Sequence, residues 1–350
     1  MLNPNTLKIA GVVSFYMGAA LIMVFVNKAV LNNAPDLPLL FLFNQMLIAV
    51  ALLHLSAAFT SRIEIPRLDL SVAQKLLPVV LVNIVGLIFN TLCLRGVEAS
   101  FFQIARGLQL PLTIFISSLN THSIPSAKVI GAATFVTVGF FLGVAPSSSI
   151  PITSAPTLLS LFYGVLSSLF IAIHAVLIKT SLPYCDNSTI KLAWWTNAGS
   201  AAFLVPFLFM TGELQLFFDK LRQGNQMMSV FGWGSLVTGI FGFLLCVAGL
   251  LSIKVTSPIT HMFSSAARSV LQTLLGVWIF KDLLTVNRAA SILVILGGTM
   301  YYTWVKSLET QQASPRQPTD LESRGIGERT GTNGSRLSVL WESDEREEKK

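Results

Sequence analysis

Two arginines lie inside apolar stretches of this chain that are each long enough to cross a lipid bilayer. The stretch at 253–282 carries Arg268, and the stretch at 99–119 carries Arg106. A charge at the centre of a membrane helix costs about 2.5–3.5 kcal/mol on insertion scales, so such a side chain is expected to face an anion or a water-filled cavity. A guanidinium offers a planar set of donors that matches phosphate oxygens. The two arginines therefore predict an anion site within the membrane.

Polar side chains accompany both arginines at the spacing of one helical face. Around the second arginine the residues of this face are His261, Ser264, Ser265, Arg268 and Gln272. Around the first arginine they are Gln103, Arg106, Thr113 and Ser117. The other faces are apolar, so each polar stripe is expected to line a cavity and bind substrate. The alternative is that Arg268 bonds backbone carbonyls of a neighbouring helix and has only a structural role.

The charges expected deep in the membrane are all positive. They are Arg106, Arg268 and, nearer the end of its span, Lys28, while Glu98 lies only at a span's edge. Two arginines with a lysine suit a diphosphate better than a monocarboxylate. Lys28 is therefore a further candidate ligand, although a lysine in the last turn of a span can instead extend to the membrane interface.

Two asparagines, Asn44 and Asn197, offer amide groups of the kind that a purine or a ribose needs. Trp194 and Trp195 shortly precede Asn197, where they could stack on a base or anchor the span at the membrane interface. The histidines show no metal-ligand spacing, and His261 has no acidic partner in the sequence around it. The sequence therefore indicates no metal, no cofactor and no catalytic group.

The composition is that of a polytopic membrane protein. Of 350 residues, 53% are hydrophobic and 12% are charged, whereas soluble domains contain about 25% charged residues. The net charge of +7 does not indicate nucleic-acid binding, because the basic residues are scattered singly between apolar spans. Cys93, Cys185 and Cys246 are too few for a disulfide framework and are expected to be packing residues.

Apolar stretches of about 20 residues predict an all-α membrane protein with ten transmembrane helices. The predicted spans are 8–31, 37–60, 73–95, 99–119, 125–145, 157–180, 189–212, 228–251, 257–280 and 286–306. Residues 1–306 then form the ten-helix domain, which begins with a retained signal anchor, and the polar residues 307–350 form a disordered cytosolic tail. An even number of spans puts both termini on one side, and the distribution of Lys and Arg favours the cytosol.

The two halves of this domain, about 8–145 and 157–306, show a weak internal repeat. An offset of 162 positions places Arg106 on Arg268. Since each half has five spans, the second half must enter the membrane in the opposite orientation, which gives two inverted five-helix repeats. Inverted repeats are typical of alternating-access transporters, whose substrate site lies near the bilayer midplane at the repeat interface. The pattern therefore predicts a transporter in which both arginines face one cavity.

Several motifs are similar to those of a known family. They are MVFVNK at 23–28, FNTLCLRGVEASFFQIARG at 89–107, TGELQ at 211–215, IKVTSPITH at 253–261 and YTWVK at 302–306. With these motifs the chain resembles the nucleotide-sugar transporters of the drug/metabolite transporter superfamily, and among them the Golgi GDP-fucose transporters. The resemblance covers about residues 8–306. It implies a ten-helix protein of the Golgi or endoplasmic reticulum membrane that exchanges a cytosolic GDP-sugar for lumenal GMP.

Two motifs of the family member that carries GDP-mannose are only partly present. Its FYNN motif falls on 194–197, where only Asn197 matches, and its GALNK motif falls on 264–268, where Arg268 replaces the lysine. Arg106 matches an arginine in the fourth span of the GDP-fucose group. The resemblance thus implies that the two arginines hold the diphosphate, while Asn197 and Ser264 help to read the base or ribose.

Other interpretations stay open. One alternative within the same class is a transporter whose substrate is GDP-mannose, another nucleotide sugar or a triose-phosphate-like solute. A multispan enzyme acting on lipid-linked sugars would need acidic residues or a metal near the membrane face, and a scaffold does not explain paired arginines. The expected partners are therefore the GDP-sugar, GMP and membrane lipids, with a homodimer as an open alternative.

Overall fold

The computed structural model describes residues 4–60, 63–145, 157–223, 227–255 and 258–313. Within these ranges, side chains are not described at 4–10, 227–228, 246–255, 258–266 and 310–313. The chain divides into two units, Met1–Glu309 and Thr310–Lys350, and the architecture below is that of the first. All regular secondary structure among the described residues is helical.

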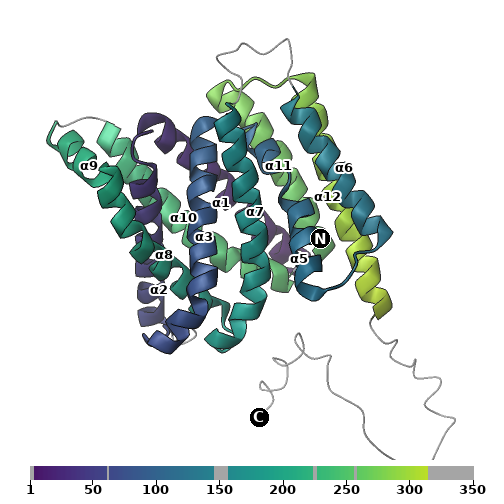
Figure 1. Cartoon of the computed structure of the whole chain (residues 1–350), viewed down its shortest axis with the longest axis horizontal. Coiled ribbons are helices and arrows are strands. Elements are labelled where there is room, and N and C mark those ends of the chain that lie inside the picture. The colour runs from purple at the N-terminus through teal and green to yellow at the C-terminus, as the bar shows by residue number, and fades with distance from the viewer. Residues whose placement is uncertain (1–3, 61–62, 146–156, 224–226, 256–257, 314–350) are drawn as a thin grey trace, which may run out of the picture. The chain divides into compact units, whose positions relative to one another are not determined.

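The helices follow one another along the chain (Figure 1). In order they are α1 (Pro4–Asn33), α2 (Pro38–Phe59), α3 (Leu70–Gly96), α4 (Phe102–Ala105), α5 (Gln109–Thr121), α6 (Ala127–Val144), α7 (Leu158–Ser181), a 3-10 helix (Leu182–Cys185), α8 (Thr189–Thr211), α9 (Glu213–Arg222), α10 (Met227–Val255), α11 (Pro258–Phe280) and α12 (Val286–Ala313). Each predicted span overlaps one of the long helices, apart from the span at 99–119, which overlaps both α4 and α5.

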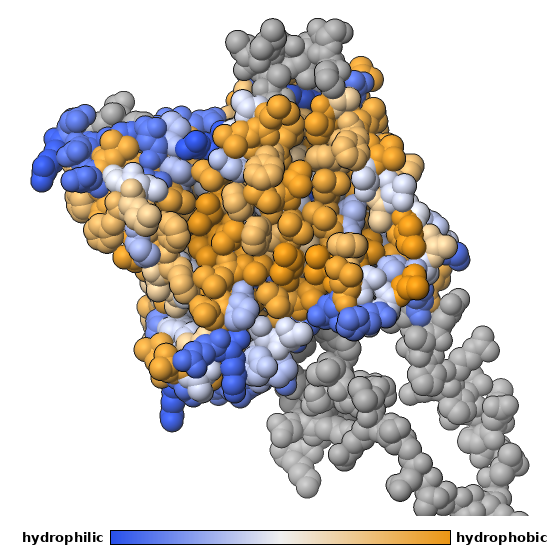
Figure 2. Space-filling view, viewed as in Figure 1, coloured by the Kyte–Doolittle hydropathy of each residue, from blue (hydrophilic) through white to orange (hydrophobic). Residues whose placement is uncertain are grey.

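Six described helical segments have the length and composition of membrane spans. They are Gly11–Asn33, Pro38–Phe59, Leu70–Gly96, Ala127–Val144, Leu158–Cys185 and Thr189–Thr211. Figure 2 shows apolar residues covering the middle of the visible face and hydrophilic residues gathered at its two ends, which is the distribution that a bilayer requires. The chain is thus a helical multi-pass membrane protein, while its arrangement as ten spans in two inverted repeats stays a prediction.

Short polar residues define where several helices begin. The caps that accept a hydrogen bond from a backbone N–H two or three residues later are Asp69, Ser126, Thr157 and Ser188. This backbone hydrogen bond lowers the pKa of the exposed Asp69 carboxyl, because it stabilises the charged form. α8 ends at Gly212, whose φ of 70° is a left-handed conformation that glycine adopts without strain.

The fourth predicted span is interrupted, which the sequence pattern did not predict. α4 ends at Ala105 and is followed by Arg106, whose φ of −96° and ψ of 5° lie outside the helical region, and α5 begins at Gln109. Pro111 explains the interruption, since it has no N–H to donate to the Gly107 carbonyl and its ring would collide with that carbonyl in a continuous helix. Gly107 also allows close packing, because a Cβ there would lie 2.8 Å from Cδ1 of Ile295. Irregular backbone is tolerated within a membrane only where it is buried in protein or lines a cavity.

Small residues hold the interrupted segment against α12. α6 packs on α12 so closely that a Cβ at Gly139 would lie 2.9 Å from the Ile295 side chain, and a Cβ at Gly298 would lie 2.6 Å from Val136. Across the same interface the Ser291 hydroxyl donates to the Gly139 carbonyl at 2.6 Å. α6 also contacts α4 and α5. The break in the fourth span is therefore fixed between α6 and α12.

Candidate functional site

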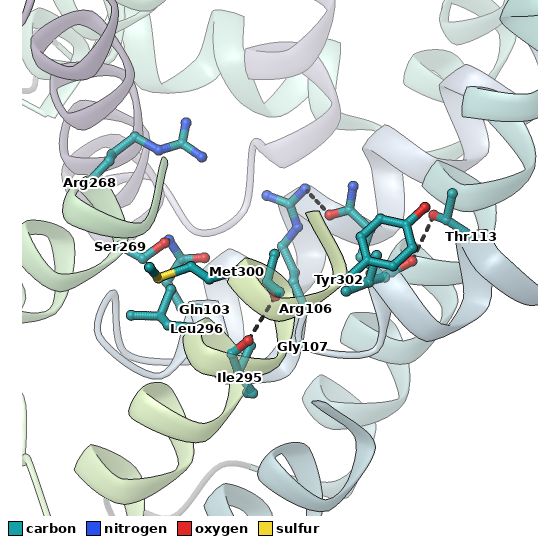
Figure 3. A pocket seen from close by; sticks show the side chains of 13 residues that line it. Gln103, Arg106, Gly107, Thr113, Arg268, Ser269, Ile295, Leu296, Met300 and Tyr302 are labelled. Carbon is teal, nitrogen blue, oxygen red and sulfur yellow. Dashed lines mark hydrogen bonds between the residues drawn. The ribbon is translucent and has the colours of Figure 1, made fainter. Parts of the chain in front are cut away.

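A cavity of about 420 Å³ lies where the interrupted α4–α5 segment meets α11 and α12. Its polar lining residues are Gln103, Arg106, Gln109, Thr113, Arg268, Ser269, Thr299 and Tyr302. Figure 3 shows the guanidinium groups of Arg106 and Arg268 extending into the space between these helices from different sides. The structure thus brings three of the predicted site residues, the two arginines and Gln103, to one cavity.

Arg106 is positioned by the end of α4. Its Nη2 donates to Oε1 of Gln109 at 3.2 Å, and its guanidinium carbon lies 5.3 Å from the centroid of the Phe102 ring. Its Nε is buried and has no hydrogen-bond partner among the described residues. Since a guanidinium has five N–H donors, most of the donors of Arg106 are available to a ligand.

Arg268 reaches the same cavity from the middle of α11. Its guanidinium carbon lies 5.9 Å from the ring centroid of Tyr16 on α1, which is a cation–π contact. The adjacent hydroxyl of Ser269 accepts a hydrogen bond from Nε2 of Gln103 at 3.1 Å. This bond joins α11 directly to α4, so the two arginine-bearing segments are linked beside the cavity.

The electrostatics of the cavity favour an anion. No carboxylate is among its lining residues in the described part of the chain, so the two guanidinium groups share the space without an acidic neighbour in the wall. Like charges in a partly desolvated space repel each other, and an anion between them removes that repulsion. The first residues of α5, Gln109 and Leu110, also line the cavity. The positive end of that helix therefore adds to the same field.

A second, larger cavity of about 710 Å³ lies among α1, α2, α3, α7, α8 and α10. Its walls are mostly apolar, and its polar groups include Gln45, Asn83, His174 and Asn197. Nε2 of His174 is buried without a partner among the described residues, whereas Nδ2 of Asn197 donates to the Ala193 carbonyl of its own helix at 2.7 Å. An apolar cavity with a few polar groups suits an uncharged ring system.

α1 lines the second cavity and contacts an arginine of the first. Tyr16 contacts Arg268 beside the first cavity, and Met23 lines the second. Seven residues of α-helix correspond to about 10 Å. A ligand with a charged part and an uncharged part could therefore extend along α1 from one cavity toward the other.

Other predicted site residues lie away from the cavities or outside the described side chains. Lys28 is buried, and its Nζ donates to the carbonyls of Leu94 and Val97 at 2.9 and 2.6 Å, at the C-terminal end of α3. Asn44 is not among the lining residues of either cavity, whereas its neighbour Gln45 lines the second. The residues whose side chains the structure leaves undescribed are His261, Ser264 and Ser265.

Three polar residues of the second cavity, Gln45, Asn83 and His174, were not predicted as site residues. Each is a polar side chain inside an apolar span, which is the same signal that identifies Arg106. The signal is weaker, because an amide or a neutral imidazole costs less to bury than a charge.

Trp194 and Trp195 pack in an apolar cluster, with Nε1 of Trp194 donating to Nε2 of His54 at 3.0 Å.

Membrane-length helices around an internal cationic cavity are typical of multi-pass proteins that carry solutes. The chain belongs to the Triose-phosphate Transporter family, which matches it over residues 7–303. It is 31% identical over 318 residues to GDP-fucose transporter 1 of Mus musculus, which covers 88% of this chain and 86% of the relative. It is 28% identical over 313 residues to GDP-fucose transporter 1 of Dictyostelium discoideum, covering 87% and 82%. An uncharacterized transporter of Schizosaccharomyces pombe is 32% identical over 295 residues, covering 84% and 74%.

Proposed function

We propose that this protein is a nucleotide-sugar antiporter that imports GDP-fucose into the Golgi lumen in exchange for GMP. The observation that carries the proposal is the meeting of Arg106 and Arg268 in one cavity whose described lining includes no carboxylate. The names of the mouse and Dictyostelium relatives support GDP-fucose as the nucleotide sugar and a transporter rather than an enzyme as the class.

The diphosphate lies between the two guanidinium groups in this proposal. Arginine–phosphate hydrogen bonds are charge-assisted and often bidentate, so the pair fixes both the position and the orientation of the diphosphate. The Gln103 amide donates to Ser269 and Gln272, so it donates to the ligand only by giving up one of these bonds. His261, Ser264 and Ser265 precede Arg268 on the same face of α11, so we place them beside the arginine as contacts to the ribose or base.

The uncharged part of the ligand extends along α1 toward the second cavity. There Asn197, Asn83 and His174 present polar groups in a mostly apolar wall. A triose phosphate would occupy only the cationic cavity and leave the second cavity without a ligand. The presence of both cavities therefore favours a nucleotide sugar over a small phosphate-bearing solute, while GDP-mannose and other nucleotide sugars are the alternatives that remain.

The positive charge of the cationic cavity explains why transport would be an exchange of one nucleotide for another. An empty cavity leaves two guanidinium groups facing each other without an anion, so the empty protein changes conformation less readily than the protein loaded with a nucleotide. GMP leaving the lumen supplies the phosphate for the return step. We propose that the two halves, as inverted repeats, rock around the arginines, and that both termini are cytosolic.

The test is uptake by purified protein in liposomes preloaded with GMP. GDP-fucose, GDP-mannose, UDP-galactose and triose phosphate are offered in parallel, with empty liposomes as the control for exchange. We expect rapid uptake of GDP-fucose that depends on internal GMP. Uptake of a different nucleotide sugar would contradict the substrate, uptake of triose phosphate alone would contradict the role of the second cavity, and no uptake of any of them would contradict the proposal as a whole.

A further inference from the structure

Two connections between helices meet at one end of the bundle, where α3 ends and α12 begins. Residues 97–101 join α3 to α4, and residues 281–285 join α11 to α12. The Glu98 carboxylate forms an ion pair with the Arg288 guanidinium in the first turn of α12. The Arg288 side chain is only 2% exposed, and its guanidinium carbon lies 4.9 Å from the Phe101 ring centroid. The Arg288 charge is therefore shielded from water, whereas the Glu98 side chain is 23% exposed, so the pair is more protected than an ordinary surface pair.

A second carboxylate joins the same two connections. The buried Asp282 accepts a hydrogen bond from the Ser100 N–H at 2.8 Å. Gly276 makes this approach possible, because a Cβ there would lie 2.8 Å from Oδ2 of Asp282 and 3.1 Å from the Ser100 nitrogen. One helical turn earlier on α11, Nε2 of Gln272 donates to the Ala99 carbonyl at 3.2 Å. Together, Gln272 and Gly276 of α11 and Asp282 beyond its end hold the connection at residues 97–101.

These contacts continue without interruption to the wall of the cationic cavity. Oε1 of Gln272 accepts a hydrogen bond from Nε2 of Gln103 at 3.0 Å, and the same Gln103 amide reaches Ser269. Gln103 and Ser269 both line the cavity (Figure 3). A ligand that accepts a hydrogen bond from the Gln103 amide therefore competes with the contacts that tie α4 to α11.

The opposite ends of the helices are joined differently. There the Lys191 amine pairs with Glu64, whose side chain is 73% exposed, and Lys306 pairs with Glu309 across one helical turn. Such exposed pairs contribute little, because water and salt screen them. In the described part of the chain, the shielded carboxylate contacts between helix junctions are those of Glu98 and Asp282 and that of the buried Glu213, which accepts hydrogen bonds from the Leu39 and Leu40 N–H groups.

We infer that Glu98, Asp282 and Arg288 form a closed gate between the cationic cavity and this end of the bundle. The inference rests on the proposed transport function, since a gate has meaning only in a protein that opens to two sides in turn. With a cytosolic N-terminus, α1 ends on the lumenal side beside the last turn of α3, so this gate faces the lumen. The buried Arg288 charge is costly to leave unpaired, so it separates from Glu98 only when water reaches the guanidinium as well, which makes the gate a two-state element.

The experiment measures whether breaking the ion pair opens this end and closes the other. Cys93, Cys185 and Cys246 are replaced by alanine in the full chain, and a single cysteine is then introduced as Ser100→Cys in the gate or as Thr113→Cys in the cavity wall. Ser100 is suitable because it is 2% exposed and its hydroxyl has no partner among the described residues. The rate of reaction with a hydrophilic maleimide is compared with and without Glu98→Gln, which keeps the shape of the side chain and removes its charge. Glu64→Gln is the matched control, because it removes the same group from an exposed ion pair.

With Glu98→Gln we expect the reaction at Ser100→Cys to accelerate by roughly tenfold, which is less than the loss of a fully buried pair would give, because Glu98 is 23% exposed and the amide still accepts a hydrogen bond from Arg288. The reaction at Thr113→Cys should slow, and Glu64→Gln should leave Ser100→Cys unreactive. Unchanged reactivity at both positions would overturn the gate. Equal acceleration at both positions would also overturn the gate, because it would mean that the whole helix bundle has become less stable. A lowered melting temperature would reveal such a loss of stability. The labelling needs no substrate, so it separates failure of the gate from failure of the proposed exchange.

Discussion

The α4–α5 segment and α11 each carry an arginine that lines the cationic cavity, yet their backbones differ. α11 is one helix from Pro258 to Phe280, whereas the α4–α5 segment is interrupted at Arg106. Arg268 extends from the middle of a regular helix and contacts Tyr16. Arg106 stands at a helix end, beside the first peptide groups of α5. The comparison teaches that a regular helix and an interrupted one can bring the same charged group to one cavity.

The first way to test the comparison is to remove the arginine of the regular helix. Arg268→Ala should reduce GDP-fucose exchange by about a hundredfold, because hydrogen bonds to charged groups contribute about 1.5–3 kcal/mol and this residue is expected to make more than one. Exchange is measured in liposomes at equal amounts of folded protein. Arg222→Ala is the control, since Arg222 is exposed on α9 and lines neither cavity. Normal exchange by a folded Arg268→Ala protein would show that this arginine is structural.

Replacing each arginine by lysine separates the two backbones. Arg106→Lys should lower exchange by roughly tenfold, because a planar bidentate donor becomes a point charge at a position fixed by the end of α4. Arg268→Lys should have a smaller effect, since the chain resembles transporters that have a lysine there within the GALNK motif. The apparent KM for GDP-fucose is the measured quantity. Equal effects of the two substitutions would mean that the interrupted backbone does not matter for binding.

Restoring the helix at the break tests its role directly. Pro111→Ala supplies the missing N–H, so α4 and α5 can join and Arg106 shifts relative to the cavity. Exchange should fall by roughly tenfold, since displacements of about 1 Å in positioning groups have effects of this size or larger. The melting temperature should be unchanged or higher, because a helix interruption is removed. Pro206→Ala in the continuous helix α8 is the control and should leave exchange unchanged.

The smallest effect is expected in the second cavity. His174→Asn should raise the KM for GDP-fucose by roughly threefold to tenfold, the range of one neutral hydrogen bond, without weakening the binding of inorganic pyrophosphate, which needs only the arginines. His122→Asn is the control, because His122 is exposed after α5. If pyrophosphate binding fell as much as GDP-fucose binding, the two cavities would not divide the ligand as proposed.

Sequence reasoning located the cationic cavity because charge inside an apolar span is a strong and local signal. It placed Arg106, Arg268 and Gln103 near one another through helical spacing and the internal repeat, and these three residues do line one cavity. The interruption at Arg106 was not predicted, because membrane helices often tolerate a proline such as Pro78, which lies inside the continuous helix α3. Whether a proline breaks a helix depends on what packs against it, and that information is not local.

The ion pair of the proposed gate could not be predicted from the sequence, for a different reason. Glu98 and Arg288 each stand at the edge of a predicted span, where charged residues are ordinary. Their pairing joins positions 190 residues apart, so only the fold reveals it. Lys28 shows the same limit: its depth was expected from the sequence, but its contacts with the carbonyls at the end of α3 depend on how α1 and α3 pack.

Those contacts have a mechanical consequence for the transport cycle. The Lys28 ammonium donates to the carbonyls of Leu94, Arg95 and Val97 at 2.9, 3.4 and 2.6 Å, so its three donors are all engaged. These hydrogen bonds hold α1 against α3, because separating the two helices would remove three hydrogen bonds from one buried charge at the same time. The two helices should then move together as one rigid unit during the transport cycle.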